Sequence, residues 1–134
     1  MPIDRTKWRE EILPRMIPEM RNLEHGFSVK DGWKMLVCDL VDHLDTHGIP
    51  YDILQIKEKF GGLCFYYRAK DKGRSHALLP DAFNKAVEKA EADSLSICED
   101  CGAPGMRLGD GWIRTLCRPC DEAFHKRRAE RFAR

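Results

Sequence analysis

Apolar side chains recur at helical spacing through the first part of the chain. Between residues 4 and 24 they are separated by steps of three and four, at Trp8, Ile12, Met16, Met20 and Leu23. Pro14 and Pro18 interrupt this pattern, because proline lacks the N–H that a helix interior needs and its ring clashes with the preceding turn. The pattern therefore predicts a helix that is kinked or split at the two prolines.

Two later segments have continuous apolar stripes and predict helices. The first begins near Asp31 and is ended by Gly48 and Pro50, and its inward positions are Trp33, Leu36, Val37, Leu40, Val41 and Leu44. The second opens at Pro80 and Asp81, and its inward positions are Phe83, Ala86, Val87 and Ala90. The polar segment 70–76, which contains Gly73, is predicted to be a loop.

Alternation of apolar and polar residues between these helices predicts a β-hairpin. Residues 51–60 and 63–68 are its strands, and Gly61-Gly62 suits a two-residue loop with a primed turn. With Phe60 opposite Leu63, the apolar face pairs Ile56 with Tyr67 and Leu54 with Ala69. The outward face pairs Lys59 with Cys64, Lys57 with Tyr66 and Gln55 with Arg68, and Glu58 opposite Phe65 is the exception to the pattern.

The outward face of this hairpin is a candidate binding surface, with the residues Lys57, Lys59, Tyr66 and Arg68. Cations interleaved with an aromatic ring can hold a single nucleic acid strand by charge and stacking. The same residues also have a purely structural interpretation, in which the lysines protect an exposed strand and Tyr66 covers the edge of the core. Both interpretations stay open at this point.

Four cysteines near the C-terminus form the strongest motif in the chain. Cys98 and Cys101 make one Cys-x2-Cys pair, Cys117 and Cys120 make a second, and fifteen residues separate the pairs. Each pair can turn two thiolates toward one point, and the intervening segment is long enough for a short hairpin that brings the pairs together. This spacing predicts one structural Zn²⁺ held by four thiolates. Disulfides are the alternative use of these cysteines.

Together the elements predict an α+β fold in two parts. Residues 1–96 are expected to form a domain of helices packed on the short antiparallel hairpin. Residues 97–134 are expected to form a four-cysteine zinc ribbon with a basic C-terminal helix, in which the segment from Trp112 to Leu116 is the strand returning to the second cysteine pair.

Composition and charge indicate in which compartment the protein acts. The chain has 134 residues and a formal net charge of +1, so it is not a polycation. No stretch approaches the roughly 18 apolar residues of a membrane span, and the charged start of the chain does not resemble a signal peptide. We therefore expect a cytoplasmic protein without membrane contact, in which paired cysteines bind metal.

Positive charge gathers at the C-terminal end. From His125 onward a single acid, Glu130, accompanies a set of cations that we take as candidate partner contacts together with Arg114: Lys126, Arg127, Arg128 and Arg131. Such an excess can meet phosphates or an acidic protein face. A solvated final helix is the structural alternative.

Nothing in the chain predicts a catalytic centre. Four thiolates saturate tetrahedral zinc and leave no position for water or substrate. His43 and His47 are four residues apart, but the glutamate of an H-E-x-x-H site is missing between them. Cys38 and Cys64 stand apart from the motif and are expected to be packed thiols. We expect no enzymatic activity and no small-molecule substrate.

The order of several short motifs resembles a group of small uncharacterised proteins of bacteria and their phages. The motifs are Gly32-Trp33, residues 56–61, Phe65-Tyr66, residues 98–105 and residues 111–117, so the resemblance spans about residues 26–120. It implies a phage or prophage setting and no particular mechanism. Residues 97–102 and 116–122 also resemble the zinc finger of the DksA/TraR family, although the loop here is shorter and no coiled coil precedes it.

Two hypotheses for function follow from these features. The first is a zinc-binding module that binds nucleic acid or a bacterial host protein through its basic surfaces. The second is a phage-type inhibitor that occludes a bacterial defence enzyme by protein–protein contact. The salt dependence of binding separates them in part, because counterion release makes nucleic acid binding steeply salt-dependent.

Overall fold

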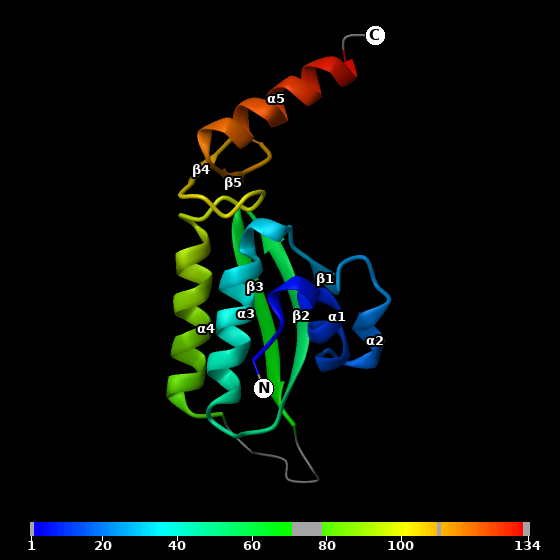
Figure 1. Cartoon of the computed structure of the whole chain (residues 1–134), viewed down its shortest axis with the longest axis vertical. Helices are drawn as coiled ribbons and strands as arrows, with labels where there is room; N and C mark the ends of the chain where they lie inside the picture. The colour runs from blue at the N-terminus through cyan, green and yellow to red at the C-terminus, as the bar shows by residue number, and fades with distance from the viewer. Residues whose placement is uncertain (1, 71–78, 110, 133–134) are drawn as a thin grey trace.

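The computed structural model describes residues 2–70, 79–109 and 111–132. The architecture is α+β, as predicted. Helices pack against a small sheet, and the cysteine segment lies at one end of the elongated molecule together with the final helix (Figure 1). From residue 71 onward the predicted loop over residues 70–76 lies outside the described residues.

The N-terminal helical segment is split, as its prolines predict. It forms η1 (Arg5–Lys7), α1 (Trp8–Ile12), η2 (Leu13–Arg15) and α2 (Pro18–Arg21). Pro14 lies inside η2, and Pro18 is the first residue of α2, a position where the missing N–H has no helical partner to lose. The apolar stripe is buried only as far as Met16, whereas Leu23 is exposed.

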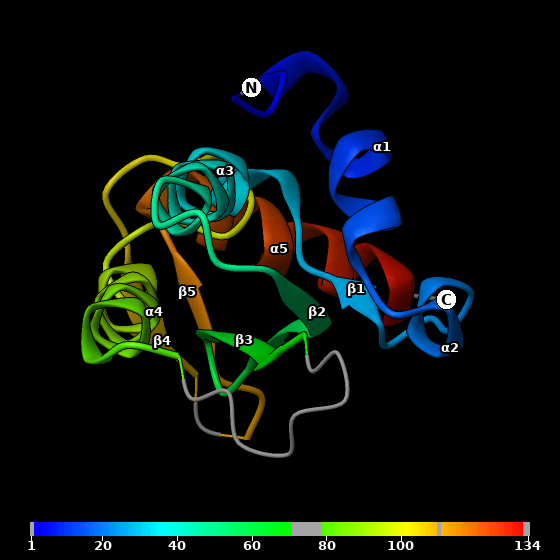
Figure 2. The same ribbon diagram turned by 90° about the horizontal axis from the view of Figure 1, so that it is seen from below.

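Two longer helices cover one face of the sheet. η3 (Asp31–Trp33) leads into α3 (Lys34–Asp45), and α4 (Asp81–Ser94) packs beside it (Figures 1 and 2). The predicted stripes provide the core of this layer, with Val37, Val41, Leu44 and Phe83 fully or almost fully buried.

The sheet contains three strands. β2 (Tyr51–Lys59) and β3 (Gly62–Ala69) are antiparallel, and β1 (Phe27–Ser28) pairs with β2 in parallel. The parallel strand β1 was not predicted, because its two residues are too few to show an alternating pattern.

The register predicted for the hairpin is wrong by two residues. Ile56 lies opposite Phe65 rather than Tyr67, and Lys59 lies opposite Gly62, so the turn is Phe60-Gly61. Both turn residues have positive φ, 53° and 80°, as a primed turn requires. Packing places the turn here, because Arg107 of the cysteine segment donates two hydrogen bonds to the Phe60 carbonyl oxygen, at 3.1 and 2.7 Å.

The predicted pairing of the second half of the hairpin is also wrong, because a bulge shifts the register by one further residue. The register shifts between Ile53 and Gln55, so that Ile53 opposes Tyr67 and Tyr51 opposes Ala69. The bulge leaves the predicted inward residue Leu54 without a partner, while Ile53 is buried in its place. A shift of two residues keeps each side chain on its predicted face, and the bulge lies farther from the turn, beyond Gln55. Lys57 and Tyr66 therefore still share the outward face.

The segment between the cysteine pairs forms a second, two-stranded sheet. β4 (Met106–Leu108) pairs with β5 (Arg114–Leu116), and α5 (Arg118–Phe132) follows directly. The strand predicted from Trp112 is shorter than expected and begins at Arg114. Trp112 therefore lies outside the ladder, and its side chain is 61% exposed.

Hydrogen bonds join the cysteine segment to the body at several further points. The Trp33 indole N–H donates to the Ile97 carbonyl oxygen at 2.9 Å, and the Gly32 N–H donates to the Glu99 carbonyl oxygen at 2.9 Å. The Thr115 hydroxyl donates to the Gly61 carbonyl oxygen at 2.5 Å. The domain boundary between residues 96 and 97 stays a prediction. The hydrogen bonds above join residues on its two sides.

Gly32 provides the test of this contact. A Cβ added to Gly32 would lie 2.1 Å from the Cys98 carbonyl oxygen, so Gly32→Ala must force the cysteine loop away from the body. Overpacking of this kind costs about 1–3 kcal/mol. We expect Gly32→Ala to lower the free energy of unfolding of the metal-loaded protein by about this amount, measured by denaturant titration with circular dichroism.

Gly111→Ala is the matched control. A Cβ at Gly111 meets no atom of the described residues within 4 Å, so this variant should unfold at the same denaturant concentration as the parent protein. Equal stability of the two alanine variants would contradict the proposed tight contact at Gly32.

Candidate metal centre and the groove beside it

The four cysteines of the motif converge on one point. Cys98 and Cys101 lie in the turn that follows α4, Cys117 follows β5, and Cys120 lies in the first turn of α5. Their sulfur atoms all lie within 4.8 Å of one another, and Cys101 Sγ is 3.5 Å from Cys117 Sγ. Among the described residues this is the only such group of three or more potential metal ligands.

Backbone hydrogen bonds shape the two loops that present the thiols. The Gly102 N–H donates to the Cys98 carbonyl oxygen at 2.9 Å, and the Cys98 N–H donates to the Ala103 carbonyl oxygen at 2.7 Å. Gly102 has φ +84°, a left-handed conformation that favours glycine. At the second pair the Asp121 N–H donates to the Cys117 carbonyl oxygen at 2.9 Å, and this bond forms part of the first turn of α5.

The surroundings of Cys98 favour its thiolate. Burial of this side chain raises its pKa, but hydrogen bonds from backbone N–H groups, including those of Cys117 and Cys101, outweigh burial and lower the pKa to about 7. A thiolate is the form that binds metal.

The donor set fits a tetrahedral metal ion. Four sulfurs bound to zinc at about 2.3 Å would be roughly 3.8 Å apart, and the sulfurs here lie within 4.8 Å of one another. The structure contains no disulfide among the six cysteines, all of which are described. The cluster could therefore hold a structural metal, which would fix the two cysteine loops and the start of α5 relative to one another.

The two cysteines outside the cluster behave as packed thiols. Cys38 is fully buried, and burial raises its pKa to about 11. Cys64 is half-buried on the hairpin. His43 and His47 stack edge to face with 5.3 Å between ring centroids, and they belong to no metal-ligand group among the residues described.

A buried ion pair lies next to the cysteine cluster. Glu99, between the first two cysteines, accepts hydrogen bonds from Arg114 Nη2 at 3.2 Å and from the Thr115 N–H at 3.1 Å. Burial raises the pKa of Glu99, and the Thr115 hydrogen bond and the charge of Arg114 offset part of that rise. The side chain of Arg114 is only 8% exposed, so little of it is available to a partner, and its predicted role in partner binding stays a prediction.

Arg114 also contacts two aromatic rings. Its guanidinium carbon lies 5.2 Å from the centroid of Trp112 and 4.7 Å from that of Phe124. Its Nε has no hydrogen-bond acceptor among the described residues. One side chain thus joins the cysteine loop, through Glu99, to the rings at the surface.

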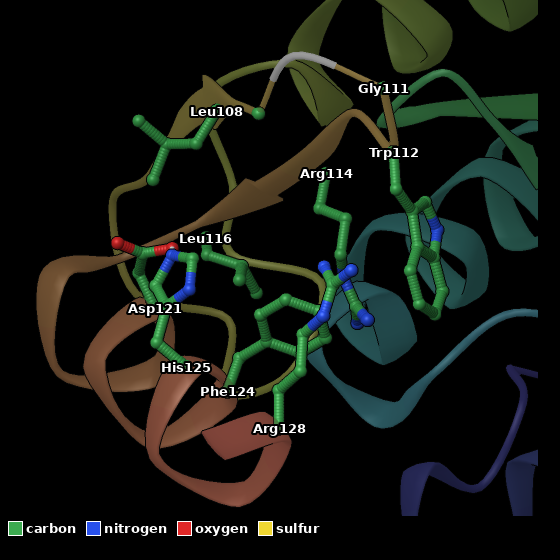
Figure 3. A pocket seen from close by; sticks show the side chains of 10 residues that line it. Leu108, Gly111, Trp112, Arg114, Leu116, Asp121, Phe124, His125 and Arg128 are labelled. Carbon is green, nitrogen blue, oxygen red and sulfur yellow. The ribbon is translucent and has the colours of Figure 1, made fainter. Parts of the chain in front are cut away.

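A groove opens where these rings meet α5. Two adjoining hollows of about 460 and 360 Å³ share Trp112, Phe124 and Arg128 in their walls. We call this surface the α5 groove and define it by Trp112, Phe124, Arg127, Arg128, Arg131 and Phe132. Figure 3 shows Arg114 entering the larger hollow from β5 and Arg128 entering it from α5, with Trp112 and Phe124 beside them.

The C-terminal cations are brought together along this groove. Arg127, Arg128 and Arg131 line it, and Lys126 is exposed on the same helix. In the part of α5 that the structure describes, an ion pair joins Arg118 to Glu122 and His125 Nε2 lies 3.2 Å from Asp121 Oδ1, whereas these four cations take part in no ion pair.

The hairpin candidates are partly engaged with their own neighbours. Lys57 Nζ lies 5.5 Å from the centroid of Tyr66, and Arg68 pairs with Asp52 at 3.6 Å. Lys59 is exposed beside the turn. Of the residues lining the α5 groove, none comes from the hairpin, so the two predicted basic surfaces are separate sets.

Sequence reasoning missed the aromatic part of the groove. Phe124, Arg128 and Phe132 follow one another at steps of four, which places them on one face of a helix. This spacing was a usable signal for a mixed aromatic and basic face. The exposure of Trp112 had no such signal, because it depends on where β5 begins.

No helix among the described residues has the length and apolar character to cross a membrane. Comparison with protein-family models, with curated proteins and with solved structures finds no match to this chain.

Substitution of one cluster cysteine tests the metal centre. We expect the purified chain to carry one zinc ion per molecule in native mass spectrometry, and Cys98→Ser to lose it, because a structural site needs all four thiolates. Cys64→Ser is the matched control, since Cys64 lies outside the cluster. Retention of a full metal equivalent by Cys98→Ser would contradict the assignment of this ligand set.

Proposed function

We propose that this protein is a non-enzymatic, zinc-stabilised module that binds nucleic acid through the exposed cations of α5. The observation that carries the proposal is the row of cations from Lys126 to Arg131, which line or adjoin a groove with exposed aromatic rings and have no acidic partners among the described residues. Unpaired arginines on one helix face attract phosphates, and aromatic rings add contact area for bases.

The local charge distribution supports this choice over general charge attraction. The whole chain has a formal net charge of +1, and residues 1–125, with 18 basic and 21 acidic side chains, carry −3 against +4 from residues 126–134. In the first half of α5, Arg118 pairs with Glu122 at 3.2 Å, and His125 Nε2 lies 3.2 Å from the Asp121 carboxylate. Positive charge is therefore concentrated at the end of α5, where a phosphate chain would be held at one defined surface.

The metal has a structural part in this proposal. Zn²⁺ held by Cys98, Cys101, Cys117 and Cys120 would have a filled coordination sphere, and so would supply folding energy instead of an activated water. The resemblance to small proteins of bacteria and phages extends the proposal to a phage or prophage setting, with the host cytoplasm as the place of action.

A second candidate is a protein partner, such as a bacterial defence enzyme that the chain occludes. Large apolar side chains are exposed outside the α5 groove, among them Met35, Phe60 and Met106. Apolar side chains of this size favour protein–protein contact where they form one continuous patch. Binding through it would depend weakly on salt, in contrast to binding through the cations of α5.

Neutralising the arginines tests the proposal. We expect the triple variant Arg127→Gln, Arg128→Gln and Arg131→Gln to weaken binding of a short labelled oligonucleotide on the order of tenfold or more at low salt. The slope of log K against log salt should fall by about two, because each phosphate that a cation neutralises on a single strand adds roughly 0.7 to the slope. Fluorescence anisotropy at several salt concentrations measures both quantities.

The control removes the same number of charges elsewhere. Lys7, Lys85 and Lys89 are exposed on other helices, and their replacement by glutamine gives the same net charge as the arginine variant. Equal binding by the two triple variants would show that net charge, and not the α5 surface, holds the strand.

A further inference from the structure

The α5 groove exposes flat aromatic surface at two places. The side chain of Trp112 is 61% exposed and that of Phe132 is 72% exposed, although both are large apolar groups. Both line the hollow of about 360 Å³ that also contains Phe124. Exposed apolar side chains grouped in one concave surface indicate a binding site more strongly than the same residues scattered singly.

Trp112 is held in place before any ligand arrives. Its ring meets Phe124 edge to face, with 5.6 Å between centroids, and the buried guanidinium of Arg114 lies 5.2 Å from its centroid. Arg114 is in turn fixed by Glu99 at 3.2 Å. A preordered ring loses little conformational entropy when another flat group stacks on it, which favours recognition of a planar ligand.

Cations lie between two of these rings along one helix face. Arg127, Arg128 and Arg131 lie between Phe124 and Phe132 in sequence and line the same hollow. A ligand that fills this surface must therefore present both planar apolar groups and negative charges. An unpaired polynucleotide has this pattern, since each base has a free π face and each linkage carries one phosphate.

We propose that the α5 groove binds unpaired nucleotides of a single nucleic acid strand, with a base stacked on Trp112 and phosphates held by the arginines of α5. This inference rests on the proposed function and specifies its ligand. In a duplex, neighbouring base pairs cover the π faces, so that Trp112 and Phe132 would contribute little. An acidic peptide would satisfy the arginines but offers no regular planar groups for the rings.

The test compares one ring substitution with matched variants of the full, zinc-loaded chain. Trp112→Ala removes the stacking surface, Trp112→Phe retains an aromatic ring, and Met106→Ala removes a side chain of similar exposure, 62%, that does not line the groove. Phe132→Ala gives a second, independent loss of ring surface. Metal content and circular dichroism of each variant establish that it is folded.

The probes are labelled oligothymidine, labelled oligouridine and a blocked-end duplex of equal length, measured by fluorescence anisotropy. We expect the single strands to bind more tightly than the duplex. Trp112→Ala should weaken single-strand binding by roughly 5- to 100-fold, as loss of one base–aromatic stack predicts. Trp112→Phe and Met106→Ala should stay close to the parent protein, and Phe132→Ala should weaken binding in the same direction as Trp112→Ala.

Three results would overturn the inference. Tighter binding of the duplex, with no effect of Trp112→Ala, would leave nucleic acid binding intact but remove the single-strand specificity. Binding of polyglutamate in preference to both nucleic acids would assign the groove to an acidic protein segment. Absence of binding to every nucleic acid probe at low salt would overturn the proposed function together with this inference.

Discussion

The convergence of four cysteine sulfurs is the constraint on which the C-terminal part of the molecule depends. This segment is too small to bury a substantial core of its own, since its buried cluster consists of Cys98, Leu116 and Cys117 with a few half-buried neighbours. Small modules of this kind fold when a metal ion supplies the missing stabilisation. The thiols also set the direction of α5, because Cys120 lies in its first turn, and so they place the groove residues that belong to α5.

The ion pair between Glu99 and Arg114 explains how a structural metal site can govern a surface several residues away. Glu99 belongs to the first cysteine loop, and Arg114 packs under Trp112 and Phe124. A buried charge is costly unless it is paired, so any displacement of the cysteine loop would also release Arg114 and the rings it supports. A metal ion held by the four cysteines would in this way also stabilise the shape of the groove.

Local patterns in the sequence predict those features that depend on local geometry. Cysteine spacing predicts the cluster, and periodic apolar residues predict the helical core, because each is determined by neighbours along the chain. The turn at Phe60 and the burial of Arg114 could not be predicted in this way. Phe60 takes its position from contacts with the cysteine segment far along the chain, and Arg114 resembles any surface cation until Glu99 is placed beside it. The helical spacing of Phe124, Arg128 and Phe132 was a usable signal for the α5 side of the groove, but the exposure of Trp112 could not be predicted, since it depends on where β5 begins.

The most direct test of this account follows the three tryptophan indole N–H signals in ¹H–¹⁵N spectra while the metal is removed with a chelator. Trp8 is buried in the body, Trp33 donates to the cysteine segment, and Trp112 lies in the groove. If the metal organises the groove through the cysteine loop, the Trp33 and Trp112 signals will shift or broaden on chelation and recover with zinc, while the Trp8 signal stays in place. A Trp112 signal that is unchanged by complete metal removal, confirmed by mass spectrometry of the same sample, would contradict the central claim.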